Sequence, residues 1–373
     1  MELEELLKKL TEFDPAGFPV ISLYLNTQPD EHGRDRFDQF VRKHCEEIAK
    51  TFPQRSPERA SFEHDVERIK YFLENDLKPS ANGAAIFACS GGEFFETAQL
   101  YAPFERHRIS VSKHPDLYPL ARLLNQYDRY VVLLADTNSA RLFVFGLGKQ
   151  LEEKQITNQK TSRTQVGGWS QARYQRHTEN YHLHHAKEVI DALERLMREE
   201  QINHVILSGD DVIIPLLLEQ MPKDLIDKIV DVLRLNVKAP QHEVLQATLA
   251  VMNERHAQYD EWSVRRLLNE YRSGGLAVVG ANDTLEALEI GQVDELIINA
   301  DRGTIEIQDV KSDPYLIATA SDGSTPAAEP RAVAIAERMV TLAQLTQAHV
   351  TFIKDASLLA GSGGVGAFLR YKS

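Results

Sequence analysis

The sequence predicts a protein of mixed α/β and α+β class with three domains. The chain has 373 residues, which is too long for one ordinary hydrophobic core. Its apolar and charged fractions, 43% and 26%, are those of globular proteins. Short apolar runs typical of buried strands alternate with segments whose apolar residues recur at helical spacing. We place the three domains at residues 1–127, 128–240 and 241–373.

A helix pair beside a small sheet is predicted for the first domain. The chain begins with an amphipathic charged helix, "MELEELLKKLTEFDP". The segment "FPVISLYLNT" is predicted as a buried strand, and two amphipathic helices follow, "RDRFDQFVRKHCEEIAKTF" and "ERASFEHDVERIKYFLEND". Two further strands, "NGAAIFACS" and "EFFETAQLY", are separated by a glycine turn at 91–92.

The second domain is predicted to alternate strands and helices. "YVVLLADTNSARLFVFGLG" (130–148) is typical of a β-hairpin, and a basic loop follows it. A helix over 180–200 and a buried strand, "HVILSG" (204–209), come next. Short helices are predicted for 212–233.

The third domain is predicted to begin with a long helix from about Gln241 to Tyr271. "GGLAVVGANDTLEALEIGQVDELIINAD" is then strand, helix, strand, with "ND" at 282–283 as N-cap candidates. A mobile loop is expected over 318–332, where the residues are small, polar and Pro-containing. A helix (333–347), the strand "HVTFIK" and a Gly-rich tail end the chain.

The composition predicts a cytoplasmic protein. The N-terminus is not a cationic start followed by an apolar signal core, and no stretch approaches 18 consecutive apolar residues, so we expect no membrane span. Cys45 and Cys89 form no ligand pattern, and we expect both to be buried free thiols in a reducing compartment.

A basic segment stands out from the acidic chain, whose formal net charge is −13. No Asp or Glu occurs between Lys154 and Thr178, while five cations do: Lys154, Lys160, Arg163, Arg173 and Arg176. The segment contains "TQVGGWSQARYQRH", residues 164–177. Such a local charge can bind an anionic partner although the whole chain repels one.

Several residues of this segment suit contact with nucleic acid. The paired glycines, Gly167 and Gly168, allow backbone angles closed to other residues and a close approach to a ligand. Gln171 brings neutral donors and an acceptor. The flanking residues offer cations for phosphates and faces for stacking: Arg163, Arg173 and Arg176, with Trp169 and Tyr174. The alternative, a long surface loop without this role, stays open on these residues alone.

Two other patterns contain residue types that are found in metal sites. His182 and His185, among four histidines of one helix, could share a metal ion, but no cysteine or carboxylate completes a set, so no metal site is predicted. Asp136, Asp210 and Asp301 follow predicted strands and could hold Mg²⁺ in a nuclease; we favour turn and cap roles for them.

The Gly-rich tail "GSGGVG" (361–366) satisfies the G-x-G-x-x-G pattern of dinucleotide-binding proteins. That pattern also needs a helix opening at it and an acid on a following strand, and only seven residues remain after Gly366. The tail therefore predicts tight turns before a final strand.

In domain order, the chain resembles the eukaryotic and archaeal class-1 peptide-chain release factors, with Pelota and the bacterial release-factor-like proteins. "GFPVISLYLN" and "NGAAIFACSGGEFFETAQLY" are similar to the family's N-terminal domain, and "YVVLLADTNSARLFVFG" with "HVILSGDD" to its middle domain. "LAGSGGVGAFLRYKS" is similar to the end of its C-terminal domain. The resemblance implies an N-terminal α/β domain, a middle RNase H-like α/β domain and a C-terminal α/β/α domain similar to kink-turn-binding ribosomal proteins.

The family's middle domain carries a Gly-Gly-Gln tip that enters the ribosomal peptidyl-transferase centre and promotes hydrolysis of peptidyl-tRNA. Gly167 and Gly168 match its glycines, and "SQARYQR" is similar to the residues that follow them. Trp169 stands at the position of the family's Gln, and the nearest amide is Gln171. The divergent ribosome-rescue branch, whose active loop has a shifted Gln, is similar in this respect.

The motifs with which family members read stop codons are missing. "FPQRSPER" (52–59) stands where decoding members carry Asn-Ile-Lys-Ser, and "ISVSKHPDLYP" lacks a Tyr-x-Cys motif. The resemblance therefore implies rescue of stalled ribosomes rather than stop-codon decoding.

The activity that the resemblance implies is that of a peptidyl-tRNA (ester) hydrolase acting on the ribosome. Its catalytic residues would be Gly167, Gly168 and Gln171, while the cations and aromatic residues of the segment would bind RNA. No metal or organic cofactor is implied. The partners would be the ribosome and peptidyl-tRNA, and delivery by a translational GTPase is left open. The main alternative is a non-hydrolytic, Pelota-like factor that recognises stalled ribosomes; a Mg²⁺-dependent nuclease ranks below it.

Overall fold

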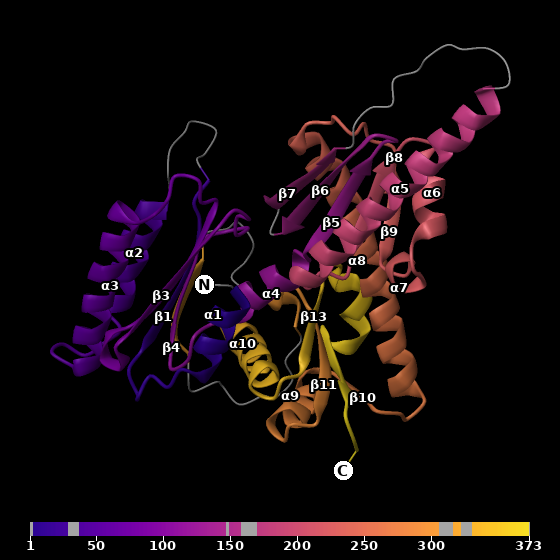
Figure 1. The fold of residues 1–373 in the computed structure, drawn as a ribbon. Coiled ribbons are helices and arrows are strands. Elements are labelled where there is room, and N and C mark those ends of the chain that lie inside the picture. The colour runs from indigo at the N-terminus through magenta and orange to yellow at the C-terminus, as the bar shows by residue number, and fades with distance from the viewer. Residues whose placement is uncertain are drawn as a thin grey trace. The chain divides into compact units, whose positions relative to one another are not determined.

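The described part of the chain in the computed structural model consists of residues 3–28, 37–146, 149–157, 170–305, 316–321 and 330–372. It forms two compact units, one of residues 1–126 with 257–373 and one of residues 127–256. Three sheets organise these units, with mixed α/β architecture throughout (Figure 1). The predicted fold class is thereby confirmed, while the three domain boundaries stay a prediction.

The N-terminal sheet is fully antiparallel and has the strand order β12-β4-β1-β2-β3. Its strands are β1 (Val20–Asn26), β2 (Gly83–Cys89), β3 (Phe94–Leu100), β4 (Arg108–Ser112) and β12 (Leu316–Ser321). The helices of the region are α1 (Leu3–Glu12), α2 (Phe37–Ala49), α3 (Pro57–Asn75) and α4 (Tyr118–Gln126). The predicted N-terminal helix, helix pair and three strands are confirmed; β4 was not foreseen.

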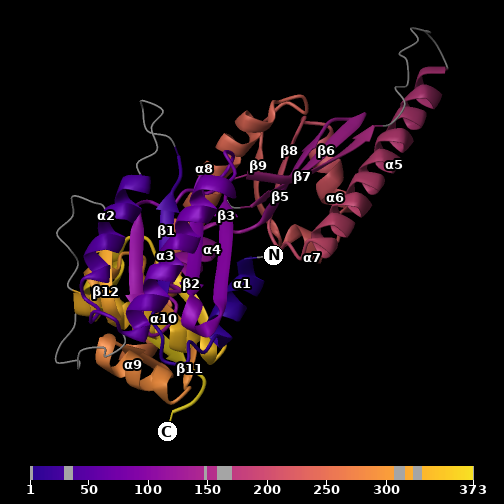
Figure 2. The same cartoon turned by 90° about the vertical axis from the view of Figure 1, so that its left-hand side faces the viewer.

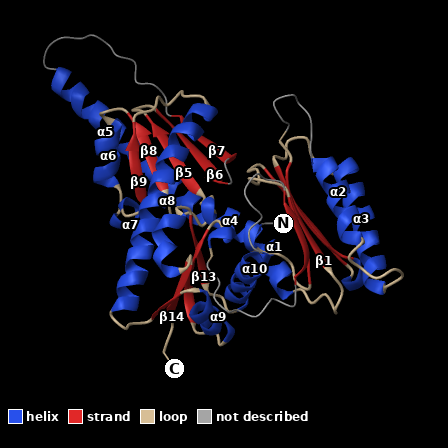
Figure 3. Ribbon diagram, turned by 180° about the vertical axis from the view of Figure 1, so that it is seen from behind, coloured by secondary structure: helices blue, strands red, loops and turns tan. Residues whose placement is uncertain are grey.

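The two faces of β1 carry different chemistry because successive side chains of a strand point to opposite faces. Ile21, Leu23 and Leu25 pack in the core that α2 and α3 cover (Figure 3). On the other face, the Tyr24 ring makes edge contacts with Phe87 and Phe104, with centroids 5.7 and 5.0 Å away. This second face leads to the polar network described below.

A C-terminal segment supplies an edge strand of the N-terminal sheet. β12 pairs antiparallel with β4, so that Thr319 lies opposite Ser110 (Figure 2). The sequence predicted a mobile loop over 318–332; this is wrong for 318–321, which are strand, and for 330–332, which begin a helix. Pairing with β4 satisfies backbone groups that a loop would leave to water.

The sheet of residues 127–256 is mixed and has the order β7-β6-β5-β8-β9. Its strands are β5 (Tyr130–Ala135), β6 (Ser139–Gly146), β7 (Lys149–Thr157), β8 (Val205–Gly209) and β9 (Ile229–Leu233). The β5–β6 hairpin and β8 were predicted. The short helices predicted for 212–233 are only partly correct, because the β-branched stretch "IVDV" pairs in parallel with β8 as strand β9.

Helices cover both faces of this sheet. They are α5 (Ser170–Glu199), α6 (Ile213–Gln220), α7 (Lys223–Ile226) and the first half of α8 (Gln241–Arg272). Val131 and Leu133 pack against apolar residues of α5, while Val132 and Leu134 pack with Val244 of α8. The alternating buried residues of β5 therefore produce a three-layer arrangement.

The C-terminal sheet has the order β10-β14-β11-β13. Its strands are β10 (Ala277–Val279), β11 (Val293–Asn299), β13 (His349–Ile353) and β14 (Val365–Leu369). It is accompanied by α9 (Ala281–Glu289) and α10 (Pro330–Leu345), with short 3-10 turns at η2 (Arg302–Thr304) and η3 (Ala356–Ser362); a further turn, η1 (Ser90–Gly92), joins β2 to β3. The predicted N-cap at 282–283 is wrong: Gly280 precedes α9 and offers no side-chain cap.

Candidate functional site

The candidate site predicted from the sequence lies where the chain passes from β7 to α5. Gly167, Gly168, Trp169 and Arg163 lie outside the described residues. The described chain resumes at Ser170, where α5 begins. The predicted helix start near residue 180 is therefore ten residues too late, because the polar residues before it carry no apolar helical pattern by which to extend the helix.

The remaining predicted site residues have helical backbone at the start of α5. These are Gln171, Arg173, Tyr174 and Arg176. Helical geometry places positions 173 and 176 on one side of the helix and positions 171 and 174 on another. The first four N–H groups of a helix have no intrahelical acceptor, and position 171 is the second residue of α5. This first turn contains no acidic residue of its own to offset the positive end of the helix dipole.

The second half of α5 is packed firmly into the core of the middle sheet. Its buried residues, at helical spacing, are Ala186, Val189, Ile190, Leu193, Leu196 and Met197, and all belong to the core of the middle sheet. The helix has 30 residues and is therefore roughly 45 Å long. Figure 1 shows its N-terminal half continuing past the ends of the strands, away from that core. The fold thus anchors one end of α5 and presents the other.

The aspartates that follow the strands serve the backbone. The Oδ1 of Asp136 accepts the N–H of Ser139 at 2.7 Å and closes the β5–β6 turn. The Oδ1 of Asp210 accepts the N–H of Ile213 at 2.8 Å, at the start of α6. Asp301 accepts a backbone N–H two residues on and caps η2. These contacts confirm the turn and cap roles that the sequence favoured over a Mg²⁺ site.

The histidines of α5 do not share one environment. His185 is buried, His182 is half-buried and His184 is exposed. Across the described ranges, no group of three or more His, Cys, Asp or Glu side chains is arranged to hold a metal ion. In the same ranges, none of the helices combines the length and the apolar character needed to span a membrane.

The Gly-rich tail forms the tight turns that the sequence predicted. Gly363 and Gly364 have φ of +66° and +80°, directly between η3 and the final strand β14. The N–H of Asn299 donates to the carbonyl of Gly364 at 2.9 Å, which ties the turn to β11. The tail is a structural turn rather than a dinucleotide-binding loop.

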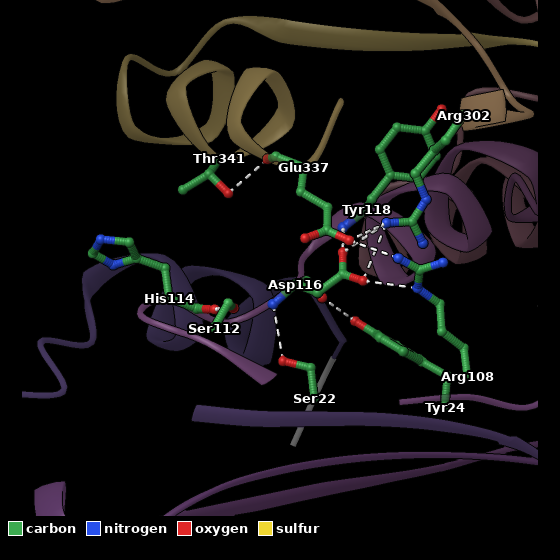
Figure 4. A network of polar contacts seen from close by, with 10 residues as sticks. All are labelled: Ser22, Tyr24, Arg108, Ser112, His114, Asp116, Tyr118, Arg302, Glu337 and Thr341. Atoms are coloured by element: carbon green, nitrogen blue, oxygen red, sulfur yellow. Dashed lines mark hydrogen bonds and ion pairs between the residues drawn. The ribbon is translucent and has the colours of Figure 1, made fainter. Parts of the chain in front are cut away.

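A buried polar network that the sequence did not reveal lies in the unit of residues 1–126 and 257–373 (Figure 4). Nη1 of Arg302 donates to both carboxylate oxygens of Asp116, at 3.2 and 3.1 Å, and to Oε1 of Glu337 at 2.7 Å. Arg108 donates to Asp116 at 3.2 Å through Nε and to the same Glu337 oxygen at 2.7 Å through Nη2.

Two tyrosines complete the network. The hydroxyl of Tyr24 donates to the carbonyl of Asp116, and that of Tyr118 donates to the carbonyl of Asn299. The Arg302 guanidinium also lies over the Tyr118 ring, 4.5 Å from its centroid. Sequence reasoning missed this network because its charged residues come from two segments 186 positions apart, 108–116 and 302–337, and belong to no motif.

The two carboxyl groups of the network have opposite pKa shifts. Burial alone would raise the pKa of Asp116, but the charges of Arg302 and Arg108 hold the pKa below its usual value. Burial, and next the neighbouring Asp116 carboxylate, raise the pKa of Glu337 to about 8. The two shifts therefore favour an ionised Asp116 beside a Glu337 that binds its proton more tightly than an ordinary glutamate.

Comparisons with known proteins show similarity to release factors along the chain. Residues 115–253 match the model of bacterial archaeo-eukaryotic release factor family 10, and residues 258–373 match eRF1 domain 3. The chain is 21% identical to peptide chain release factor subunit 1 of Thermococcus onnurineus (strain NA1), over all of this chain and 97% of that relative.

Solved structures with similar chains include an archaeal translation termination factor, aRF1, and the Pelota of Archaeoglobus fulgidus. The first is 17% identical with a TM-score of 0.26 over 99% of this chain and 97% of that one. The second is 14% identical with a TM-score of 0.35 over 78% and 80%. Two consecutive segments thus match release-factor models and a peptide chain release factor matches the whole length, so the chain is similar to class-1 release factors from end to end.

Proposed function

We propose that the protein is a ribosome-binding translation factor that promotes hydrolysis of peptidyl-tRNA on stalled ribosomes. The observation that carries the proposal is the glycine pair Gly167-Gly168 immediately before α5, with Gln171 in the first turn of that helix. The full-length similarity to a peptide chain release factor supports it. The absence of the decoding motifs from the sequence favours rescue over termination at stop codons. Cytoplasmic localisation follows from the proposed work on ribosomes.

In the proposed reaction, water attacks the ester carbonyl carbon that links the nascent peptide to the tRNA ribose. A tetrahedral oxyanion forms, and the bond to the ribose oxygen then breaks. Gly167 and Gly168 would let the backbone approach the ester closely. Gln171 would orient the water or the terminal ribose through its side chain or its backbone N–H, with the ribosome supplying most of the cavity.

The RNA contacts would come from the flanks of the glycine pair. We assign phosphate contacts to Arg163, Arg173 and Arg176, and stacking to Trp169 and Tyr174. The helical spacing of positions 173 and 176 would let both arginines contact phosphates of the same RNA strand. No step of this mechanism uses a metal or an organic cofactor, and the similarity to release factors makes a translational GTPase a candidate partner.

A peptide-release assay on purified stalled ribosome–nascent-chain complexes tests the activity. The wild-type chain is expected to release peptide from the intact complexes, and Gln171→Ala to release it roughly 10²-fold more slowly. Gln246→Ala, an exposed glutamine on α8, is the matched control and should keep the wild-type rate.

Different results would point elsewhere. If the wild-type chain binds stalled ribosomes but releases no peptide, the protein is a non-hydrolytic recognition factor. If Gln171→Ala releases peptide as fast as the wild type, the role of Gln171 is wrong. Mg²⁺-dependent cleavage of RNA would favour the nuclease alternative, which the backbone-bonded Asp136 and Asp210 do not support.

A further inference from the structure

The buried network connects segments that are far apart in the chain. Arg108 and Asp116 come from β4 and the loop after it, whereas Arg302 and Glu337 come from η2 and α10. Asp116, Arg302 and Glu337 are all buried, with at most 8% of each residue exposed. Charged groups removed from water in this way depend on one another, because a buried charge that loses its partners is not solvated by water.

Helices and strands of the same two segments also contact one another around the network. β12 of the C-terminal segment extends the N-terminal sheet through β4, and α1 and α4 of the N-terminal segment pack against α10. Asn125 of α4 further bonds β13: its Nδ2 donates to the Val350 carbonyl at 3.2 Å, and its Oδ1 accepts the Phe352 N–H at 3.0 Å. The network thus lies where two parts of one unit hold each other.

The contact between the carboxyl groups of Asp116 and Glu337 requires one proton. The carboxyl groups of Asp116 and Glu337 face each other and act as hydrogen-bond partners (Figure 4). A carboxylate has no hydrogen to donate, so this contact exists only while one of the two groups is protonated. Both oxygens of Asp116 accept hydrogen bonds, from the two arginines and from the N–H of Tyr118 at 3.1 Å, whereas both arginine contacts of Glu337 fall on Oε1 at 2.7 Å. This favours the ionised form of Asp116 and leaves the proton to Oε2 of Glu337.

We propose that Glu337 is a proton-controlled latch between residues 1–126 and residues 257–373 of this unit. With its proton, Glu337 donates to Asp116 and accepts from both arginines, and the two segments stay joined. Without it, two carboxylates face each other in a buried site and the segments separate more often. The groups that face Glu337 are Tyr24, Arg108, Asp116 and Arg302, with Tyr118 beyond Arg302.

The direction of the pH effect follows from linkage. In the separated state Glu337 is exposed to water and has the ordinary pKa of a glutamate, near 4.5, whereas in the joined state its pKa is about 8. The proton's contribution to joining is therefore complete below the ordinary pKa and is lost as the pH rises through the pKa of the joined state. Opening should increase by up to roughly tenfold per pH unit between those limits and level off above them.

Hydrogen–deuterium exchange, corrected for the pH dependence of the chemical exchange step, measures this opening. Protection of β4 and α4 in the full chain is expected to fall about tenfold per unit from pH 5.5 to 7.5, while β5 and β8 of the other unit keep theirs. Glu337→Gln cannot ionise but can still donate to Asp116 and accept from the arginines, so its β4 protection should not change with pH. Glu289→Gln on α9 is the control, because it removes the charge of an exposed partner of Arg338. Its β4 protection should respond to pH like that of the wild type.

The latch is overturned if wild-type β4 keeps the same protection across this pH range, or if Glu337→Gln retains the wild-type pH response. Should Glu337→Gln fail to fold, carbon-13 NMR of glutamate carboxyl groups in the wild-type chain decides. One glutamate that stays protonated to about pH 8 supports the latch. Titration of every glutamate near its ordinary pKa refutes it.

Discussion

The turn before the last strand depends on a single residue, Gly364. Its φ of +80° is in the left-handed region, and a Cβ there would lie 2.7 Å from the Thr304 carbonyl oxygen and 3.0 Å from Nδ2 of Asn299. Only glycine accepts this backbone without strain and permits so close an approach. Gly364, together with Gly363 before it, thus connects η3 to β14.

Gly364→Ala is expected to destabilise its unit by about 2–4 kcal/mol, the sum of left-handed strain and overpacking. Gly361→Ala is the matched control, because a Cβ at that glycine meets nothing within 4 Å and its φ is not in the left-handed region. Urea denaturation followed by circular dichroism measures both changes. Equal midpoints for the two variants would contradict the steric argument.

Among the elements, β13 is an edge strand that does not leave its outer side to solvent. β11 pairs with one side of it, and Asn125 of α4 bonds the other through Val350 and Phe352. A side-chain amide here takes the place of a neighbouring strand, since it offers one donor and one acceptor. Edge strands left open are sites of unwanted pairing between chains.

Asn125→Ala should lower the stability of the unit by about 1–3 kcal/mol, since a donor and an acceptor of a partly buried strand lose their partner. Exchange of the Phe352 amide hydrogen should accelerate most. Asn75→Ala, which removes one exposed bond to the Tyr71 carbonyl at the end of α3, is the control and should change stability by less than about 0.5 kcal/mol. Similar exchange at Phe352 in both variants would show that α4 does not protect this edge.

At the scale of the whole molecule, α8 contributes to more than one core. Val244 and Met252 of its first half pack on the middle sheet, while Val264 and Leu267 of its second half pack with Ile297 of the C-terminal sheet. The division between the two compact units accordingly falls inside this helix, at residues 256 and 257. A helix of 32 residues can do this because its two halves bury separate faces.

Both cysteines lie in the same unit, so their reactivity depends on the folding of that unit. Cys45 and Cys89 are buried free thiols in the unit of residues 1–126 and 257–373. Burial raises the pKa of Cys45 to about 12, from 9.0, and also raises that of Cys89. At pH 8 the reactive thiolate of Cys45 is therefore about 10³-fold rarer than in an unfolded chain.

Labelling of Cys45 with a thiol-specific disulfide reagent at pH 8 should proceed about 10³-fold more slowly in the native chain than in urea, and labelling of Cys89 should also be slower. Cys89→Ala isolates the response of Cys45, and Cys45→Ala that of Cys89. If either thiol of the native chain reacts as fast as in urea, that cysteine is accessible to solvent. The prediction that its side chain is buried would then be wrong.

Local patterns in the sequence were sufficient for much of the fold. Apolar spacing predicted α2, α3 and the long helix α8, and the buried runs predicted β1, β2, β5 and β8. Turn chemistry predicted the role of the tail glycines. These predictions succeed because each depends on neighbouring residues, whose periodicity and turn preferences are local properties.

What the sequence by itself determined is therefore most of the helices and strands and the resemblance to release factors, while the candidate loop stays a prediction. Only the tertiary structure decided that a segment expected to be a loop would become β12 on a distant sheet, and that "IVDV" would be a strand. It also brought Arg108, Asp116, Arg302 and Glu337 together. Such outcomes depend on which distant groups burial brings into contact, and no window of neighbouring residues contains that information.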